Sequence, residues 1–400
     1  MVRKMRSISS EIRVAVVANF ALAYNRKILL GAATAAAALP QVRLYHCDHF
    51  QAQAVINSRH PEFDRVLLGA SEPRLQLPAL FARQSIRTVD TSGEMYPPLL
   101  PRVISDDLAV GRRAAEYLLE RGFSRYLFFG YKDFHWSNLR LAGYRSALAG
   151  RGHLTKVLLT ADVAAWDVSA IAEKLFDSIA GSSGTPVAVF CANDSCAAML
   201  VEACVHAGLR IPEQAAILGV DDDEMYTQLR HPNISSIQLQ CRRIGYEAMQ
   251  WLLADAPPAP PSTAAVRTLL IPPQTVVSRQ STDIVAVDDP LLRLAAAYIR
   301  DHLHEGVNIK LLTSALGVSR TTLETRFKRI LGRLPGEEVR RQRLARACEM
   351  LSSGNMAVGD IARRVGFSSA QLFSESFRRY KKMTPLAYRE SMRLDVATSP

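Results

Sequence analysis

The sequence predicts an α/β domain with parallel sheets flanked by helices, followed by an all-α domain with two helix-turn-helix motifs. Three observations support this. Short β-branched runs alternate with helical segments from Ile12 onward, a segment near the C-terminus is repeated about fifty residues later, and positive charge is concentrated around that repeat. A chain of 400 residues is long enough for two or three domains, and its hydrophobic content of 48% is sufficient for a core in each.

In the first part of the chain, predicted strands alternate with predicted helices. Short β-rich runs separated by helices are typical of parallel sheets that are covered on both faces. The segment 269–279 is predicted to form an edge strand, where proline is tolerated. The other predicted strands are 12–17, 42–45, 63–68, 85–89, 125–129, 156–159, 187–191 and 215–219, and the predicted helices are 26–39, 54–56, 111–120, 139–149, 169–179 and 195–207.

Polar residues follow the ends of several of these strands. Ligands of parallel α/β sheets bind beyond the carboxyl ends of the strands. Carboxylates and amides hydrogen-bond to adjacent hydroxyl groups, and an aromatic ring packs on the apolar face of a sugar, so a cleft for a polyhydroxylated ligand is predicted. Helix N-capping explains residues such as Asn193 and Asp194 equally well. The candidate ligand-binding residues are Asn19, Tyr24, Asn25, Asp107, Trp136, Arg140, Asn193, Asp194 and Asp221.

The repeated segment has the pattern of a helix-turn-helix motif. In its first copy, 309–316 has the apolar spacing of an amphipathic helix, Gly317 suits a turn that needs positive φ, and Ser319 is placed to cap the next helix. Leu323 and Phe327 are four residues apart and can be buried together. The opposite face is polar and suits insertion into the DNA major groove. That face carries Arg320, Thr321, Glu324, Thr325 and Lys328.

The second copy repeats this plan, with Gly366 in the turn and Ser368 as the predicted cap. The offset between the copies changes from forty-nine to fifty residues, which predicts one inserted residue in the second recognition-helix region. A connecting helix is predicted over 335–353, with a C-cap at Gly354-Asn355 and arginines 340, 341, 343 and 346 on its polar sides. The outward residues of the second recognition helix are Ala370, Gln371, Ser374, Glu375 and Arg378.

The charge distribution supports polyanion binding by the C-terminal part. The net charge is +11, and residues 289–400 hold 20 Lys and Arg against 11 Asp and Glu. A basic domain beside a nearly neutral body indicates local binding of a polyanion. Membrane-surface binding would require a long apolar helix face, which the sequence lacks. The six scattered cysteines have no zinc-ligand spacing, so reduced thiols in the cytoplasm are expected, with no metal and no cofactor.

Two stretches of the sequence resemble known families. Residues 291–390, with the motif Ile361-Ala-x-x-Val-Gly-Phe followed by Phe377-Arg-Arg, resemble the AraC-type DNA-binding domain. Residues 11–280 resemble the effector domain of the LacI group, itself similar to periplasmic sugar-binding proteins, through 187–194 and 217–222. The combination resembles the regulators of xylose operons. It implies an effector domain at 11–280, a linker at 281–290 and a DNA-binding domain at 291–400.

The resemblance also implies a mechanism. A two-lobed effector domain would close on a monosaccharide, most simply a pentose such as xylose, and so control an activator. Asp221, Arg140, Asn193 and Asp194 match ligand positions of the family, and Asn25 places an amide where those regulators carry a carboxylate. The implied partners are double-stranded DNA, a second copy of the chain and RNA polymerase. No membrane partner is expected.

Two alternatives belong to other functional classes. A sugar-binding or transport module with a basic tail would need an export signal, and none is expected at the start of this sequence. An α/β enzyme acting on carbohydrates would need a paired set of catalytic groups. The sequence contains no Gly-x-Gly-x-x-Gly, P-loop or Gly-x-Ser-x-Gly motif, although carboxylates at strand ends could serve such chemistry.

Overall fold

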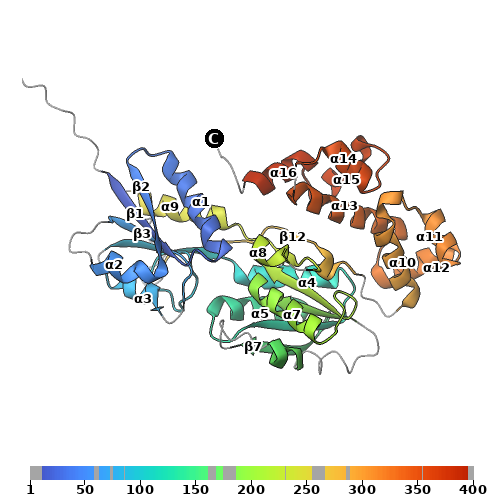
Figure 1. Ribbon diagram of the computed structural model, residues 1–400, viewed down its shortest axis with the longest axis horizontal. Helices are drawn as coiled ribbons and strands as arrows, with labels where there is room; N and C mark the ends of the chain where they lie inside the picture. The colour runs from blue at the N-terminus through green and yellow to red at the C-terminus, as the bar shows by residue number, and fades with distance from the viewer. Residues whose placement is uncertain are drawn as a thin grey trace, which may run out of the picture.

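The structure is a computed structural model of the 400-residue chain. It describes residues 11–57, 63–72, 75–84, 86–160, 168–173, 186–229, 231–254, 266–284, 289–353 and 355–394. In Figure 1 two α/β lobes, coloured blue and green, lie beside each other, and a helical domain in orange and red adjoins them. No helix within these residues is long and apolar enough to cross a bilayer.

The first lobe contains a six-stranded parallel sheet. Its strand order is β11-β5-β4-β3-β1-β2, and its central residues, such as Val14, Leu67 and Val103, are fully buried. Helix α1 packs against α9, which follows it by about two hundred residues (Figure 1). The strands are β1 (Ile12–Ala18), β2 (Val42–Asp48), β3 (Arg65–Leu68), β4 (Arg87–Asp90), β5 (Arg102–Ser105) and β11 (Thr268–Ile271), and the helices are α1 (Ala23–Ala37), α2 (Ala52–Asn57), α3 (Leu77–Ala82) and α9 (Cys241–Leu253).

The second lobe has the same plan, with one antiparallel edge strand. Its order is β12-β10-β9-β8-β6-β7, and only the β10–β12 pair of this sheet is antiparallel. The strands are β6 (Arg125–Tyr131), β7 (His153–Thr160), β8 (Val187–Cys191), β9 (Ala215–Val220), β10 (Ser235–Ile237) and β12 (Val276–Val277), and the helices are α4 (Asp107–Leu119), α5 (His135–Leu148), α7 (Asp194–His206) and α8 (Glu224–Thr227).

Within the described residues, the chain passes between the lobes after β5, after β10 and after β11. Backbone hydrogen bonds join these crossings. The Asp106 N–H donates to the Ile271 carbonyl at 2.8 Å, and the Gln238 N–H donates to the Thr275 carbonyl at 3.0 Å. The lobes are therefore connected by adjacent segments that can act together as a hinge.

Helices α4 and α5 of the second lobe touch backbone to backbone. A Cβ added to Gly111 would lie 2.0 Å from the Arg140 carbonyl oxygen, and one added to Gly143 would lie 2.1 Å from the Leu108 carbonyl oxygen. Two backbones can approach this closely only where no side chain separates them. The contact fixes the start of α4 against the middle of α5, and each of these two segments carries a candidate ligand residue.

Most of the predicted strands and helices are present, but the segment 269–279 differs from its prediction. It forms two short strands, β11 at the edge of the first sheet and β12 at the edge of the second, instead of one edge strand. Pro272 and Pro273 lie between them and cannot donate backbone hydrogen bonds, so the ladder ends there. The predictions also lacked β5 and α9. The predicted helix 169–179 lies partly outside the described residues, and its described part, 169–173, is helical.

The C-terminal domain is helical throughout, with two hydrophobic cores, one for each helix-turn-helix unit. Leu323 and Phe327 are fully buried in the first core, and Phe373 and Phe377 in the second. The connecting helix has its predicted bounds and contributes to both cores; its predicted cap residue Gly354 lies outside the described residues. The helices are α10 (Pro290–Asp301), α11 (Ile309–Leu316), α12 (Arg320–Leu331), α13 (Pro335–Ser353), α14 (Val358–Arg364), α15 (Ala370–Lys381) and α16 (Pro385–Leu394).

The caps of the two recognition helices correct one prediction. Ser319 caps α12 by accepting from the Thr322 N–H, as predicted, but Ser369 rather than Ser368 caps α15. The inserted residue therefore lies in the second turn and not in the recognition helix. Counting from the caps, α12 and α15 keep a constant offset of fifty residues.

The predicted linker 281–290 begins inside the effector body. Ser281 and Thr282 are fully buried, and the Ser281 hydroxyl donates to the Ile217 carbonyl oxygen at 2.6 Å. The polar composition of this stretch suggested a linker, but its hydroxyl groups are satisfied inside the second lobe. We propose that the boundary lies between Asp283 and Asp289.

Candidate effector cleft and DNA interface

The two lobes meet at the carboxyl ends of β1 and β9. Lys27, on α1 of the first lobe, donates from Nζ to the carbonyl oxygens of Asp221 (2.8 Å) and Asp222 (3.0 Å) in the second. Beside it, a guanidinium nitrogen of Arg26 lies 3.8 Å from a carboxylate oxygen of Asp223. Asp221, one of the strand-end residues that the sequence indicated, thus lies at the boundary between the lobes. Lys27 was missing from the prediction, although it directly follows Tyr24-Asn25-Arg26.

The turn after β9 carries one carboxylate, that of Asp221, and is held in place by another, that of Asp194. Asp194, 1% exposed, accepts from the Asp223 N–H at 2.8 Å and from the Ser236 hydroxyl at 2.7 Å, so it holds the turn in place. Asp221 has a φ of 104°, a strained conformation for a residue other than glycine. No described residue donates a hydrogen bond to the Asp221 carboxylate. Burial raises the pKa of Asp221 to about 6, although Arg140 and Lys27 act against the rise.

A buried ion pair lies beside this turn. Arg140 donates from Nε to the Asp107 carboxylate at 2.8 Å and from Nη1 to the Ala192 carbonyl oxygen at 2.5 Å, and both side chains of the pair are almost fully buried. Burial lowers the pKa of Arg140, but the nearby Asp107 and Asp221 carboxylates more than reverse this effect. The pair fixes α4, α5 and the end of β8 around one point. Among the described residues, no acceptor is bonded to Nη2 of Arg140, which remains available as a donor group.

Aromatic side chains lie around the same point. The Arg140 guanidinium lies 4.8 Å from the Trp136 ring centroid, and that ring makes an edge contact with Tyr131 at 5.8 Å. Tyr24 donates its hydroxyl to the Thr91 carbonyl oxygen at 2.8 Å, and burial raises its pKa well above the usual value. Trp136 and Tyr24 therefore supply ring surface from the two lobes.

The three asparagines of the predicted set all hydrogen-bond to backbone groups. Asn25 is 1% exposed; its Nδ2 donates to the carbonyl oxygens of Asn19 and Ala70, and its Oδ1 accepts from the Ala70 N–H. Its two amide protons are used in this way, so Asn25 fixes the loops after β1 and β3. Asn193 caps α7 through the Cys196 N–H at 3.0 Å, which matches the capping alternative. Asn19 stays partly exposed, with its Oδ1 accepting from the Ala21 N–H.

One contact between the lobes has no counterpart in the prediction. The ring of Tyr96, in the loop after β4, stacks on the ring of His135 at the start of α5, with centroids 4.7 Å apart. The two residues are far apart in the sequence and belong to different lobes. No motif marks either one, so only the tertiary structure could reveal this contact.

The recognition helices present the predicted residues on their outer faces. Arg320, Thr321, Thr325 and Lys328 on α12 are exposed, and Glu324 is partly exposed. On α15, Ala370, Gln371, Glu375 and Arg378 are exposed and Ser374 partly so. Some of these groups bind one another: Arg320 pairs with Glu324 at 2.7 Å, and Gln371 donates to Glu375 at 3.2 Å. Binding to bases would require these pairs to open.

The DNA-binding domain contacts the effector body through charged residues at the start of α13. Glu338 is fully buried and pairs with Arg333 (2.7 Å) and Arg341 (2.6 Å). Arg333 also donates to the carbonyl oxygen of Glu120, at the end of α4. Burial raises the pKa of Glu338, but Arg341 and Arg333 outweigh this and hold it at about 2. The ion cluster thus connects the connecting helix to the helix that starts at Asp107.

Comparisons with known proteins agree with both parts of this structure. A periplasmic binding protein-like domain matches residues 115–282, and a helix-turn-helix domain matches residues 312–391. The chain belongs to the AraC-type transcription regulators, and in it the two helix-turn-helix units follow a periplasmic-binding-protein-like domain. It is a DNA-binding transcription regulator.

Its relatives include regulators of sugar operons. The xylose operon regulatory protein of Escherichia coli K12 is 27% identical over 302 residues, which cover 74% of this chain and 75% of that protein. The probable transcription factor PqrA of Proteus vulgaris is 35% identical over 88 residues, covering 22% of this chain and 72% of PqrA. The solved structure of the xylose-binding transcription activator xylR has the same fold, with a TM-score of 0.63 and 23% identity over 96% of this chain and 99% of that one.

Proposed function

We propose that this regulator is controlled by a monosaccharide bound between its two lobes, a pentose such as xylose, and that it activates transcription. The observation that carries the proposal is the Asp221 carboxylate, which lies at the lobe boundary without a hydrogen-bond donor from the described residues. A relative named for the xylose operon and a fold neighbour described as a xylose-binding activator support the choice of sugar and the direction of control.

The chemistry of the boundary suits a sugar. A carboxylate accepts hydrogen bonds from two adjacent hydroxyl groups, as Asp221 could do, and the Arg140 guanidinium has a remaining donor for a ring or hydroxyl oxygen. Trp136 offers an apolar ring face. Tyr24 on α1 of the first lobe would touch the same ligand as these second-lobe groups, so binding would favour the closed arrangement over an open one. Asn25 and Asp194 would act by holding these groups in position.

The proposal extends to DNA and protein partners. Helices α12 and α15 would each enter a major groove, with α13 setting their separation. The base-contacting residues are proposed to come from the ten outer positions of those helices given above. Homodimerisation and contact with RNA polymerase in the cytoplasm complete the proposal. The ion cluster around Glu338 offers a route by which lobe closure reaches the DNA-binding domain.

Thermal unfolding of the full chain with a panel of pentoses and hexoses tests the effector. A bound sugar at a hundred times its Kd stabilises the folded protein by about 2.7 kcal/mol, which should raise the Tm by roughly 5 to 10 °C. Asp221→Ala should remove the shift, whereas Asp133→Ala, at an exposed position of the same lobe, should retain it. If no monosaccharide raises the Tm, the effector is not a monosaccharide.

The affinity for the sugar should fall as the pH falls through about 6. The folded-state pKa of Asp221 is raised to about 6 from a usual value near 4, so the free protein takes up a proton in this range. A protonated carboxyl loses acceptor capacity, so affinity should fall by up to tenfold per pH unit below about 6. Calorimetric titrations at pH 5, 6 and 7.5 measure this. Asp221→Asn should bind weakly and lose the pH dependence, and a flat profile for the unmodified chain would contradict the role of Asp221.

A further inference from the structure

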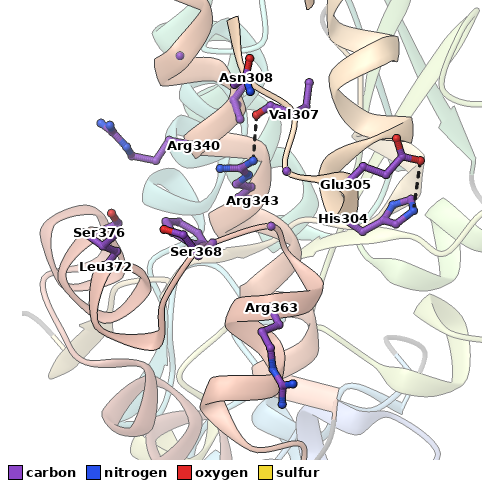
Figure 2. A pocket seen from close by; sticks show the side chains of 15 residues that line it. His304, Glu305, Val307, Asn308, Arg340, Arg343, Arg363, Ser368, Leu372 and Ser376 are labelled. Carbon is purple, nitrogen blue, oxygen red and sulfur yellow. Dashed lines mark hydrogen bonds and ion pairs between the residues drawn. The ribbon is translucent and has the colours of Figure 1, made fainter. Parts of the chain in front are cut away.

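A hollow of about 640 Å³ lies between the two helix-turn-helix units. Figure 2 shows its lining, which comes from the segment before α11, from α13 and from the second unit. Arg340 and Arg343 extend from α13, while Ser368, Leu372 and Ser376 lie on the side of the second unit (Figure 2). All three parts of the domain thus contribute side chains to one groove.

The groove is rich in cations whose donors are only partly used. The carboxylate in its lining, Glu305, lies 3.6 Å from an imidazole nitrogen of His304. Arg343 donates from Nη2 to the Val307 carbonyl oxygen at 3.0 Å, but its Nε is buried with no hydrogen-bond partner. Arg340 is exposed, and among the described residues it has neither an ion pair nor a side-chain hydrogen bond. A ligand with anionic oxygens in the groove would give Arg340 a counter-charge and would add to the single printed hydrogen bond of the Arg343 guanidinium.

A hydroxyl group joins these cations because the second turn is longer than the first. The first turn has one residue, Val318, between Gly317 and the cap Ser319, whereas the second has two, Phe367 and Ser368, between Gly366 and the cap Ser369. The Ser369 hydroxyl accepts from the Leu372 N–H as the helix cap. Ser368 is therefore the additional serine, and it lines the groove. Hydroxyl groups and arginine side chains together are common ligands of DNA phosphates.

The location of the groove selects the anion. Leu372 and Ser376 lie on a flank of α15, next to the face that carries Gln371 and Glu375. DNA that places successive major grooves on α12 and α15 has to carry its backbone past the region between the units. We propose that this groove binds the phosphodiester backbone between the two major-groove segments, with Arg340, Arg343 and Ser368 as phosphate ligands. The inference rests on DNA binding by both units.

The salt dependence of DNA binding tests this site in the full chain. The duplex is one selected in vitro by the unmodified protein, and the Kd is measured between 50 and 200 mM salt. Each lost phosphate contact makes the slope of log K against log salt less steep by about 0.9. Between 50 and 200 mM salt, the affinity of Arg340→Ala should therefore fall by a factor about threefold smaller than that of the unmodified protein. Binding to selected and unrelated sequences should weaken alike. Arg340→Lys should retain most of the slope, because it keeps the charge.

Arg145→Ala is the matched control, because it removes the same charge from an exposed position on α5. Ethylation of single phosphates gives an independent test: modification between the two major-groove segments should impair the unmodified protein but not Arg340→Ala. If Arg340→Ala has the slope of Arg145→Ala, or if both proteins respond equally to ethylation, the phosphate site is excluded. If the unmodified chain does not bind DNA at all, the function itself fails, which is a different result.

Discussion

Replacing Gly111 with alanine should destabilise the second lobe by about 3 kcal/mol and abolish the response to the effector. The new Cβ would lie 2.0 Å from the Arg140 carbonyl oxygen and 2.6 Å from the Tyr144 nitrogen, and both are backbone atoms. Neither can rotate away, so α4 and α5 have to separate. Separation would move the Asp107 carboxylate away from the Arg140 Nε, which donates to it at 2.8 Å in the cleft. Urea unfolding and sugar titration measure the two effects.

Gly359→Ala provides the control for this substitution. Gly359 lies in helix α14, and a Cβ added there would have no atom within 4 Å. Alanine favours a helix over glycine, so this variant should be unchanged or more stable by up to about 1 kcal/mol. If Gly111→Ala were as stable as Gly359→Ala and still bound sugar, the close contact of α4 and α5 would not exist in solution.

Replacing Glu338 with glutamine should loosen the DNA-binding domain from the effector body and destabilise it by about 3 kcal/mol. Glu338 is fully buried, while Arg333 and Arg341 are at most about one-fifth exposed, so the substitution leaves two cations with little solvent and without their shared carboxylate. Asp283 remains as a further negative charge acting on Arg341. Fluorescence energy transfer between labels on the two domains, followed during urea unfolding, would report their separation. Sugar binding should persist while its effect on DNA affinity is lost.

The Glu338 carboxylate should also make the contact between the domains weaker at acid pH. The folded-state pKa of Glu338 is lowered to about 2 from 4.5, so its contribution is present above about pH 4.5 and disappears as the pH falls towards 2. Glu338→Gln should lack this transition. The control is Glu116→Gln, which removes the negative charge of an exposed ion pair with Arg113, 3.7 Å away. It should change stability by less than about 1 kcal/mol. Equal stability of the two variants would show that the cluster does not hold the domains together.

Local patterns explain why so much of the fold was predictable. The central strands of both sheets are buried runs of β-branched and other apolar residues, and such runs can be recognised without knowledge of their neighbours. The helix-turn-helix units depend on a glycine with positive φ, a serine cap and a pair of buried side chains four residues apart. Those features lie within about ten residues of each other. The cap of α15 was misplaced by one residue because Ser368 and Ser369 are adjacent and chemically identical.

The cleft was predicted less well because its residues act across large distances in the chain. The sequence placed polar groups at strand ends but could not show which of them are used internally. Asn25 and Asp194 bind backbone and turn groups within their own lobes, while Asp221 has no such partner. Lys27 and the Tyr96–His135 stack become recognisable only when the lobes are brought together.

The sequence by itself determined the two domains, the parallel α/β pattern, both recognition helices and the helix that joins them, because each depends on spacing along a short stretch of chain. Only the tertiary structure shows that 269–279 divides between two sheets, that Arg333, paired with Glu338, reaches the effector body, and that Arg340, Arg343 and Ser368 line one groove. These features arise from contacts between segments distant in the sequence. Their energies depend on burial and on the position of opposite charges, which periodicity along the chain does not encode.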